Sequence, residues 1–248
     1  MKHLKAYYEF LKCDKRLHDN LSNFAAFSLS ELPKYDLDAK VIIVGAARVG
    51  KSTHFFQIAR RIFVNKLKTD VNSVDRYLLS HDFITDSIIY TRDQSLKRFK
   101  SVSKSIISFD ETYLVADKRE TMNTAQINIT KFLDVFALQN NVVFALTQQL
   151  SDLDSRVVNK ATVLYLDYQR SKSLLYAKNH SFPLLPQTFD FDYYIKNPWQ
   201  LDHKPQALSS LKHRRGFVGT NYWNDMEGVP LYENYHEYKQ NQVDKLNF

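Results

Sequence analysis

The residues Gly45-Ala46-Ala47-Arg48-Val49-Gly50-Lys51-Ser52-Thr53 match the pattern GxxxxGK[ST] at every position. The apolar residues 41–44 precede them and favour a buried strand, and residues 54–61 continue in a helical pattern. A loop between a strand and a helix surrounds an anion with backbone N–H groups and the positive end of the helix. The stretch therefore predicts a nucleotide-binding loop, in which Lys51 reaches the β- and γ-phosphates and the Ser52 hydroxyl ligates Mg²⁺.

Two carboxylates follow a second apolar run. Residues 105–109 predict a buried strand that ends at Asp110 and Glu111, about 60 residues after the glycine loop. At such a strand end, beside a phosphate-binding loop, the first acid supports the Mg²⁺ ion and the second polarises the attacking water. We therefore expect Asp110 to join Ser52 at the metal and Glu111 to be catalytic.

A third polar strand end lies further along the chain. Residues 142–146 predict a buried strand that ends in Thr147-Gln148-Gln149. The Gln148 side chain either bonds the γ-phosphate or the water, or caps the following helix, and both interpretations stay open. Because the carboxyl ends of parallel strands meet at one edge of a sheet, we expect the glycine loop, Asp110 and Gln148 to converge there.

Helices and strands alternate along much of the chain, which predicts an α/β fold with a mostly parallel central sheet in three layers. Helical spacing covers residues 1–30, and further helices are expected at 51–67 and 129–140. Additional strands are expected at 76–80, 88–90, 162–166 and 173–177, the last two forming a hairpin that closes one edge of the sheet. The predicted organisation is a helical segment at 1–35, a nucleotide-binding core at 36–180 and a C-terminal extension at 181–248.

Two basic segments are compatible either with contact to nucleic acid or with a purely structural role. Residues 92–104 carry lysines and an arginine between apolar residues, as in a loop facing nucleic acid or in a solvated helix face. Residues 181–248 are rich in prolines and aromatic residues and contain the basic patch 212–215. This extension either wraps the core or a neighbouring subunit, or stacks on a nucleic-acid strand and neutralises it.

The composition excludes some kinds of protein and favours others. The net charge is +7 and the isoelectric point about 9.2, which favours polyanionic partners such as nucleic acid. Cys13 is the single cysteine, which excludes an internal disulfide and a cysteine-based zinc cluster. No apolar run approaches the roughly 20 residues of a membrane span, and the N-terminus lacks the apolar core of a signal peptide. These features favour a cytoplasmic protein.

Residues 41–53, 106–111 and 142–156 together resemble the FtsK–HerA group of P-loop ATPases. Within this group they are most similar to the small viral genome-packaging ATPases and to the zonular-occludens-toxin-type phage assembly ATPases. The features that carry the resemblance are the Asp110-Glu111 pair, the strand that ends in Thr147-Gln148, and a short segment that runs from Leu153 to Arg156. The resemblance covers about residues 40–178 and neither end of the chain.

The resemblance implies a RecA/FtsK–HerA-like fold with a Walker A motif at 45–53 and a Walker B motif at 106–111. It implies ATP and Mg²⁺ bound between the subunits of a homo-oligomeric ring, Gln148 as a γ-phosphate sensor, and hydrolysis that moves single- or double-stranded DNA. A viral capsid or portal would then be a partner, and the host cytoplasm the compartment. Members of the group set an arginine of a neighbouring subunit against the transition-state charge. Here Arg156 and Arg119 are the candidates, with Arg48 as a third that would act in cis. Membrane-anchored members carry a spanning helix after the ATPase domain, and its absence from this sequence favours the soluble packaging type.

Two other functions use the same core. A replication or recombination ATPase, of helicase, initiator or helicase-loader type, shares these motifs, but no DNA-reading domain such as a helix-turn-helix stands out. A P-loop small-molecule kinase requires an acceptor pocket and usually an arginine-rich lid, and the sequence shows no clear lid. The motifs therefore favour a DNA-translocating ATPase over both.

Overall fold

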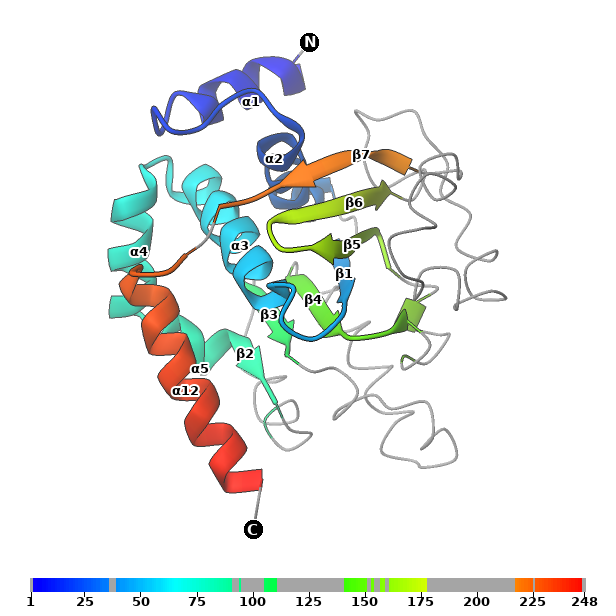
Figure 1. Ribbon diagram of the computed structural model, residues 1–248. Helices are drawn as coiled ribbons and strands as arrows, with labels where there is room; N and C mark the ends of the chain where they lie inside the picture. The colour runs from blue at the N-terminus through cyan, green and yellow to red at the C-terminus, as the bar shows by residue number, and fades with distance from the viewer. Residues whose placement is uncertain are drawn as a thin grey trace.

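A computed structural model describes residues 2–35, 39–90, 94, 105–110, 141–150, 153, 157–158, 161–177, 217–224 and 226–246. A seven-stranded sheet forms its centre, in the order β2-β3-β4-β1-β5-β6-β7 (Figure 1). The strands from β2 to β5 pair in parallel, whereas β6 and β7 are antiparallel to their neighbours. The strands are β1 (Ala39–Gly45), β2 (Ile88–Ile89), β3 (Ile106–Phe109), β4 (Val142–Thr147), β5 (Val163–Gln169), β6 (Lys172–Ala177) and β7 (Phe217–Tyr222).

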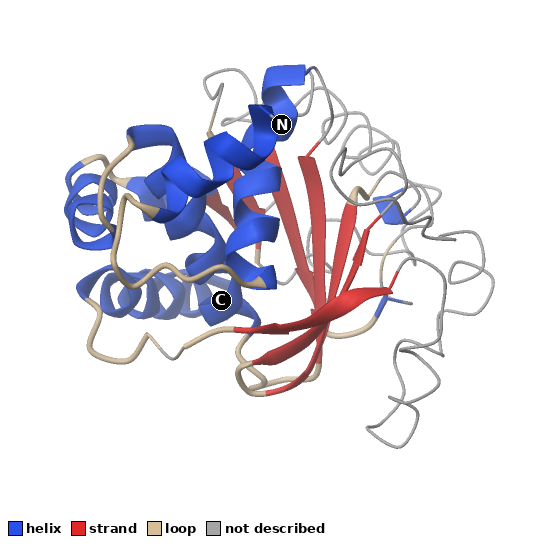
Figure 2. Cartoon of the chain, turned by 90° about the horizontal axis from the view of Figure 1, so that it is seen from above, coloured by secondary structure: helices blue, strands red, loops and turns tan. Residues whose placement is uncertain are grey.

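The helices in the described part of the chain gather on one face of the sheet (Figure 2). They are α1 (Lys2–Leu11), α2 (Leu21–Glu31), the 3-10 helix η1 (Leu32–Tyr35), α3 (Lys51–Leu67), α4 (Val71–Ser80), α5 (Phe83–Ser87) and α12 (Pro230–Leu246). None of them combines the length and apolarity that crossing a bilayer requires. The α/β class and the mostly parallel sheet are as expected from the sequence.

Both faces of the central strand β1 are buried. Val41 and Ile43 belong to the large hydrophobic cluster under the helices, whereas Ile42 and Val44 belong to a second cluster on the opposite face. Side chains alternate between the two faces of a strand, so a continuous apolar run is required where both faces are covered. Packing on both faces therefore fixes the end of β1, from which the glycine loop starts.

The strand expected at 76–80 is wrong, because these residues form the second half of α4. The helix begins at the N-cap Asp70, whose carboxylate accepts hydrogen bonds from backbone N–H groups of the first turn. Its buried residues are Val71, Val74 and Leu78, which share one face of a helix. The apolar part of this segment, Tyr77 to Leu79, is too short to distinguish a helix from a strand by its periodicity. Asp70, a favoured N-cap residue, indicates the helix.

The expected hairpin is present as β5 and β6, and the weaker strand at 88–90 is present as β2. The hairpin does not close the sheet, because β7 pairs with β6 and forms the edge itself. The expected helix at 129–140, the basic patch 212–215 and all of 92–104 except Gln94 lie outside the described residues. The three-part division of the chain stays a prediction.

Candidate functional site

The loop between β1 and α3 depends on its two glycines. A Cβ atom on Gly45 would lie 2.6 Å from the backbone oxygen of Asp167 and 2.7 Å from Val49 Cγ2, so no larger residue fits. Gly50 has φ +100°, which side chains disfavour. Arg48 also takes a positive φ, of 66°. The close packing on β5 and the left-handed turn hold the loop against the start of α3.

Lys51 lies at the first position of α3 and folds back over the loop. Its ammonium donates to the backbone oxygens of Gly45, at 2.7 Å, and of Ala46, at 3.0 Å. The 17-residue helix α3 directs its unpaired N–H groups and the positive end of its dipole toward the same place. The loop is therefore arranged to bind an anion.

A cavity of about 870 Å³ opens over the loop, within the range of sites that bind small molecules. The ends of β3 and β4 line it with Asp110 and Gln148, as expected, and the β5–β6 turn and α12 add Arg170 and Lys239. The loop residues that line it are Ala47, Arg48, Gly50, Lys51, Ser52 and Thr53, whereas Gly45, Ala46 and Val49 do not. The structure thus brings the three strand ends together in one cavity.

Oxygen atoms of Ser52 and Asp110 converge on one point of this cavity. The Tyr235 hydroxyl lies 2.9 Å from Ser52 Oγ and donates to Asp110 Oδ2. The same Asp110 oxygen accepts from the Tyr90 hydroxyl at 2.8 Å and from Lys239 Nζ at 3.2 Å. A hydroxyl and a carboxylate within reach of a single atom are the oxygen donors that Mg²⁺ prefers, so the pair fits that ion.

The phenol groups at this point remain protonated. Burial raises the pKa of Tyr235 well above its usual range, and the negative charge of Asp110 adds to the effect. The pKa of Tyr90 is raised for the same two reasons. Both hydroxyls are therefore neutral hydrogen-bond donors to the carboxylate at physiological pH.

Three of the expected catalytic residues, Glu111, Arg119 and Arg156, lie outside the described residues. Their roles stay predictions. Arg48 lies exposed at the cavity, where a finger acting in cis would be needed. Arg170, in the turn between β5 and β6, also lines the cavity and was not expected.

The contribution of α12 was not foreseen either. Tyr232, Tyr235 and Lys239 follow one another at helical spacing and all line the cavity. Pro230 at the first position of the helix was a usable start signal. The sequence therefore offers a signal for the helix itself. It offers none for the contact between Tyr235 and Ser52, because the two residues are 183 positions apart in the chain.

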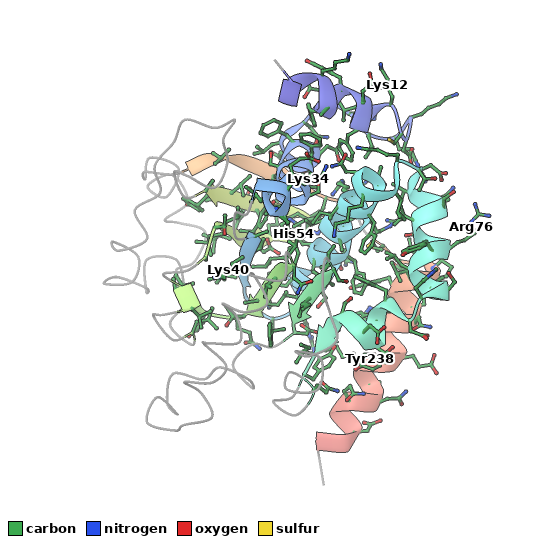
Figure 3. All side chains as sticks on the ribbon, turned by 180° about the vertical axis from the view of Figure 1, so that it is seen from behind. Lys12, Lys34, Lys40, His54, Arg76 and Tyr238 are labelled. Carbon is green, nitrogen blue, oxygen red and sulfur yellow. The ribbon has the colours of Figure 1, made fainter. Side chains whose placement is uncertain are left out.

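A buried polar network supports the first turn of α3 from below. His54 on α3 is fully buried in the interior (Figure 3). It bonds Asp167 Oδ1 through Nδ1 at 2.9 Å and Asn221 Nδ2 through Nε2 at 2.9 Å. Asn221 in turn accepts from Ser22 at 2.6 Å, and the Trp223 ring stacks on His54 at 4.0 Å. The network joins the beginning of α3 to β5, β7 and α2.

Only one of the two carboxylate oxygens of Asp167 is hydrogen-bonded in this network. Burial raises the pKa of Asp167, although the neighbouring His54 and Lys51 act in the opposite direction. Within the described residues, the second carboxylate oxygen of Asp167 has no hydrogen-bond partner. Since Asn221 donates to Nε2, the hydrogen of a neutral His54 lies on Nδ1 and points to Asp167.

Comparison with family models and with curated protein sequences gives no match. Among solved structures, the chain is similar to the genome-packaging NTPase B204 of Sulfolobus turreted icosahedral virus 2 in complex with ATP-γ-S. The identity is 14%, over 58% of this chain and 94% of that one, with a TM-score of 0.38. The DNA-packaging ATPase B204 of Sulfolobus turreted icosahedral virus matches at 16% identity over 58% and 94%, with a TM-score of 0.37. A chain of the E. coli MS115-1 HORMA:CdnC:Trip13 complex matches at 16% identity over 64% of each chain, with a TM-score of 0.35.

Proposed function

We propose that this chain binds ATP with Mg²⁺ in the cavity over residues 45–53 and hydrolyses it. The observation that carries the proposal is the convergence of Lys51, Ser52 and Asp110 in one cavity at the N-terminus of α3. An ammonium and a helix N-terminus bind phosphate, and the two oxygen donors suit the metal ion that accompanies a nucleoside triphosphate.

Each residue has a distinct part in the reaction. Lys51 and the backbone N–H groups of the loop hold the β- and γ-phosphates, and Ser52 and Asp110 hold the metal. When bound, Mg²⁺ neutralises charge that develops on the phosphate oxygens. Gln148 orients the γ-phosphate or the water, and Glu111 activates the water. Arg156, Arg119 or Arg48 supplies positive charge to the transition state.

We propose further that hydrolysis moves DNA through a homo-oligomeric ring, as in genome packaging into a viral capsid. The net charge of +7 favours a polyanionic partner, and the motifs resemble those of the FtsK–HerA group. Ring formation places the arginine of one subunit at the nucleotide of the next. DNA should therefore stimulate hydrolysis, and nucleotide should promote assembly.

The test combines binding and turnover. Lys51→Ala should weaken the binding of a fluorescent ATP analogue at least tenfold, whereas Glu111→Gln should preserve binding and abolish phosphate release. Lys12→Ala, which removes the same charge from a side chain that is 69% exposed, is the control and should behave as wild type. Equal binding by wild type and Lys51→Ala would refute the nucleotide site.

The DNA step is tested with wild-type protein and DNA of both kinds. Duplex DNA that raises the hydrolysis rate and drives assembly in sedimentation supports translocation. Strand separation without movement on intact duplex would favour a replication ATPase instead. Transfer of the γ-phosphate to a nucleoside without hydrolysis would favour a kinase.

A further inference from the structure

Helix α12 occupies the point at which the two proposed metal ligands meet. The Tyr235 hydroxyl contacts Ser52 Oγ and Asp110 Oδ2, and Lys239 Nζ lies 3.2 Å from the same Asp110 oxygen. One turn earlier on the helix, the Tyr232 hydroxyl bonds Thr53 Oγ1 at 2.6 Å. Two consecutive residues in the first turn of α3 and the acid at the end of β3 are therefore all bonded to α12.

These contacts replace two effects of a bound cation, which would neutralise the charge of Asp110 and would link Asp110 to Ser52. Lys239 supplies positive charge to Asp110, and the Tyr235 hydroxyl bridges Asp110 to Ser52. Magnesium binds oxygen ligands at about 2.0–2.1 Å and keeps several water molecules around it. A phenol oxygen within hydrogen-bonding distance of both ligands fills the space between them. The helix and the ion therefore exclude one another at this point.

The position of Tyr235 is held by packing as well as by hydrogen bonds. Its side chain is 1% exposed, and its ring packs at 4.9 Å from that of Phe56 on α3. Leu231, one turn earlier, is fully buried in the same cluster. The helix contacts α4 and α5 (Figure 1). Packing as well as hydrogen bonds therefore holds Tyr235 at the site in this state of the chain.

The segment before α12 provides a pivot. Gly228 takes φ +75°, lines the cavity, and has no atom within 4 Å of the position of a Cβ. The neighbouring Glu227 and Gly228 form an exposed turn directly before the helix. The backbone at Gly228 is therefore restricted neither by a side chain nor by close packing.

We infer that α12 is an autoinhibitory element, whose Tyr235 and Lys239 occupy the metal site until the helix releases Asp110 and Ser52. The inference rests on the proposed function, because it concerns the same site and its Mg²⁺. The nucleotide alone contacts mainly the loop and is little affected. The binding of nucleotide together with Mg²⁺ requires the helix to withdraw.

The test measures the affinity for a non-hydrolysable ATP analogue with and without Mg²⁺, by calorimetry. Tyr235→Phe combined with Lys239→Met keeps the buried ring and the length of the second side chain but removes the hydroxyl and the charge. We expect the ratio of the affinity with Mg²⁺ to the affinity without it to rise about tenfold, and the ratio is compared because Lys239 lines the cavity and its charge acts on the nucleotide in both conditions. Tyr77→Phe, which removes a phenol hydroxyl on α4, is the matched control and should bind as wild type.

A second measurement uses the wild-type chain and does not depend on the folding of a variant. Hydrogen exchange of the backbone amides of α12 should accelerate when the analogue and Mg²⁺ are added together, and not with the analogue alone. Unchanged exchange, or Mg²⁺-dependent binding that the double variant leaves equal or weaker, would overturn the autoinhibitory role.

The failure of this inference is distinguishable from failure of the proposed function. Binding that Mg²⁺ strengthens and Lys51→Ala abolishes, with no effect of the α12 substitutions, overturns the autoinhibition alone. An absence of binding in wild type and in the double variant, with and without Mg²⁺, overturns both.

Discussion

Replacing His54 by phenylalanine should destabilise the fold by about 3–5 kcal/mol at pH 7, the usual cost of removing one partner from a buried polar pair. The phenylalanine ring keeps the stacking on Trp223, which lies 4.0 Å away, but it is larger than imidazole and overpacks this fully buried site. Both nitrogen contacts are lost, each at 2.9 Å, to Asp167 and to Asn221. The loss therefore combines the polar contribution of the network with a smaller steric cost, and the nearly isosteric Asp167→Asn is needed beside it.

The magnitude follows from the groups that lose their partners. A buried amide donor without an acceptor, as at Asn221, costs about 1–3 kcal/mol. A buried carboxylate that loses its donor costs at least as much, although Asp167 can limit this by binding a proton. In the variant, Asp167 is protonated when folded and ionised when unfolded over a wider pH range. Its raised folded pKa means that stability is present below the unfolded pKa and is lost as the pH rises, so the variant should weaken as the pH rises above about 4.

Urea unfolding, followed by far-UV circular dichroism at pH 7, measures the change in the free energy of unfolding. Asp167→Asn is the control, because it preserves an acceptor oxygen for His54 Nδ1, and it should cost about 1 kcal/mol. A loss below about 1 kcal/mol for His54→Phe, or equal losses for the two variants, would refute the role of the nitrogen contacts.

Three further predictions, one of them with a matched control variant, test other parts of the fold. Gly45→Ala should cost about 1–3 kcal/mol in urea unfolding, because its Cβ would lie 2.6 Å from a backbone oxygen of β5. Gly219→Ala, whose Cβ would meet only the tip of a leucine side chain at 2.8 Å, should be close to neutral, and a reversed order would contradict this reasoning. Asp14→Asn should cost about 1–2 kcal/mol at pH 7, because hydrogen bonds from the partly exposed Arg16 hold the pKa of Asp14 below its usual range. Thermal melts should show this deficit shrinking as the pH falls below about 4, where the unfolded chain binds the proton, and a deficit independent of pH would refute it. Asn20→Ala removes the N-cap of α2 and should cost about 1 kcal/mol by the same melts; no loss would show that Asn23 N–H finds another acceptor.

Local patterns predicted the parts of the site that local geometry builds. The motif at residues 45–53 determines its own loop, since its glycines meet steric requirements within a few residues and on the adjacent strand. Asp110 and Gln148 were placed correctly at the cavity because both end apolar runs, and parallel strand ends converge. These predictions needed only periodicity and the rules of parallel sheets.

Contacts between distant segments could not be predicted in this way. Nothing near Tyr235 indicates that its hydroxyl meets Ser52, because the contact depends on how α12 docks on α4 and α5. The helical pattern of residues 54–61 predicts the position of His54 in a helix, but its partners Asp167 and Asn221 lie 113 and 167 residues away. Such contacts form only when the distant segments pack together, and the local patterns of a single sequence do not show which segments do so.

The position of β7 at the sheet edge has a consequence for synthesis on the ribosome. Ser22 bonds Asn221 across 199 residues, and β7 can pair with β6 only after residue 222 has been translated. Until then the exposed edge of β6 and the apolar face of α2 are open to other chains. A nascent chain stalled before this strand should therefore bind chaperones. It should become resistant to protease only when β7 and α12 have emerged from the exit tunnel.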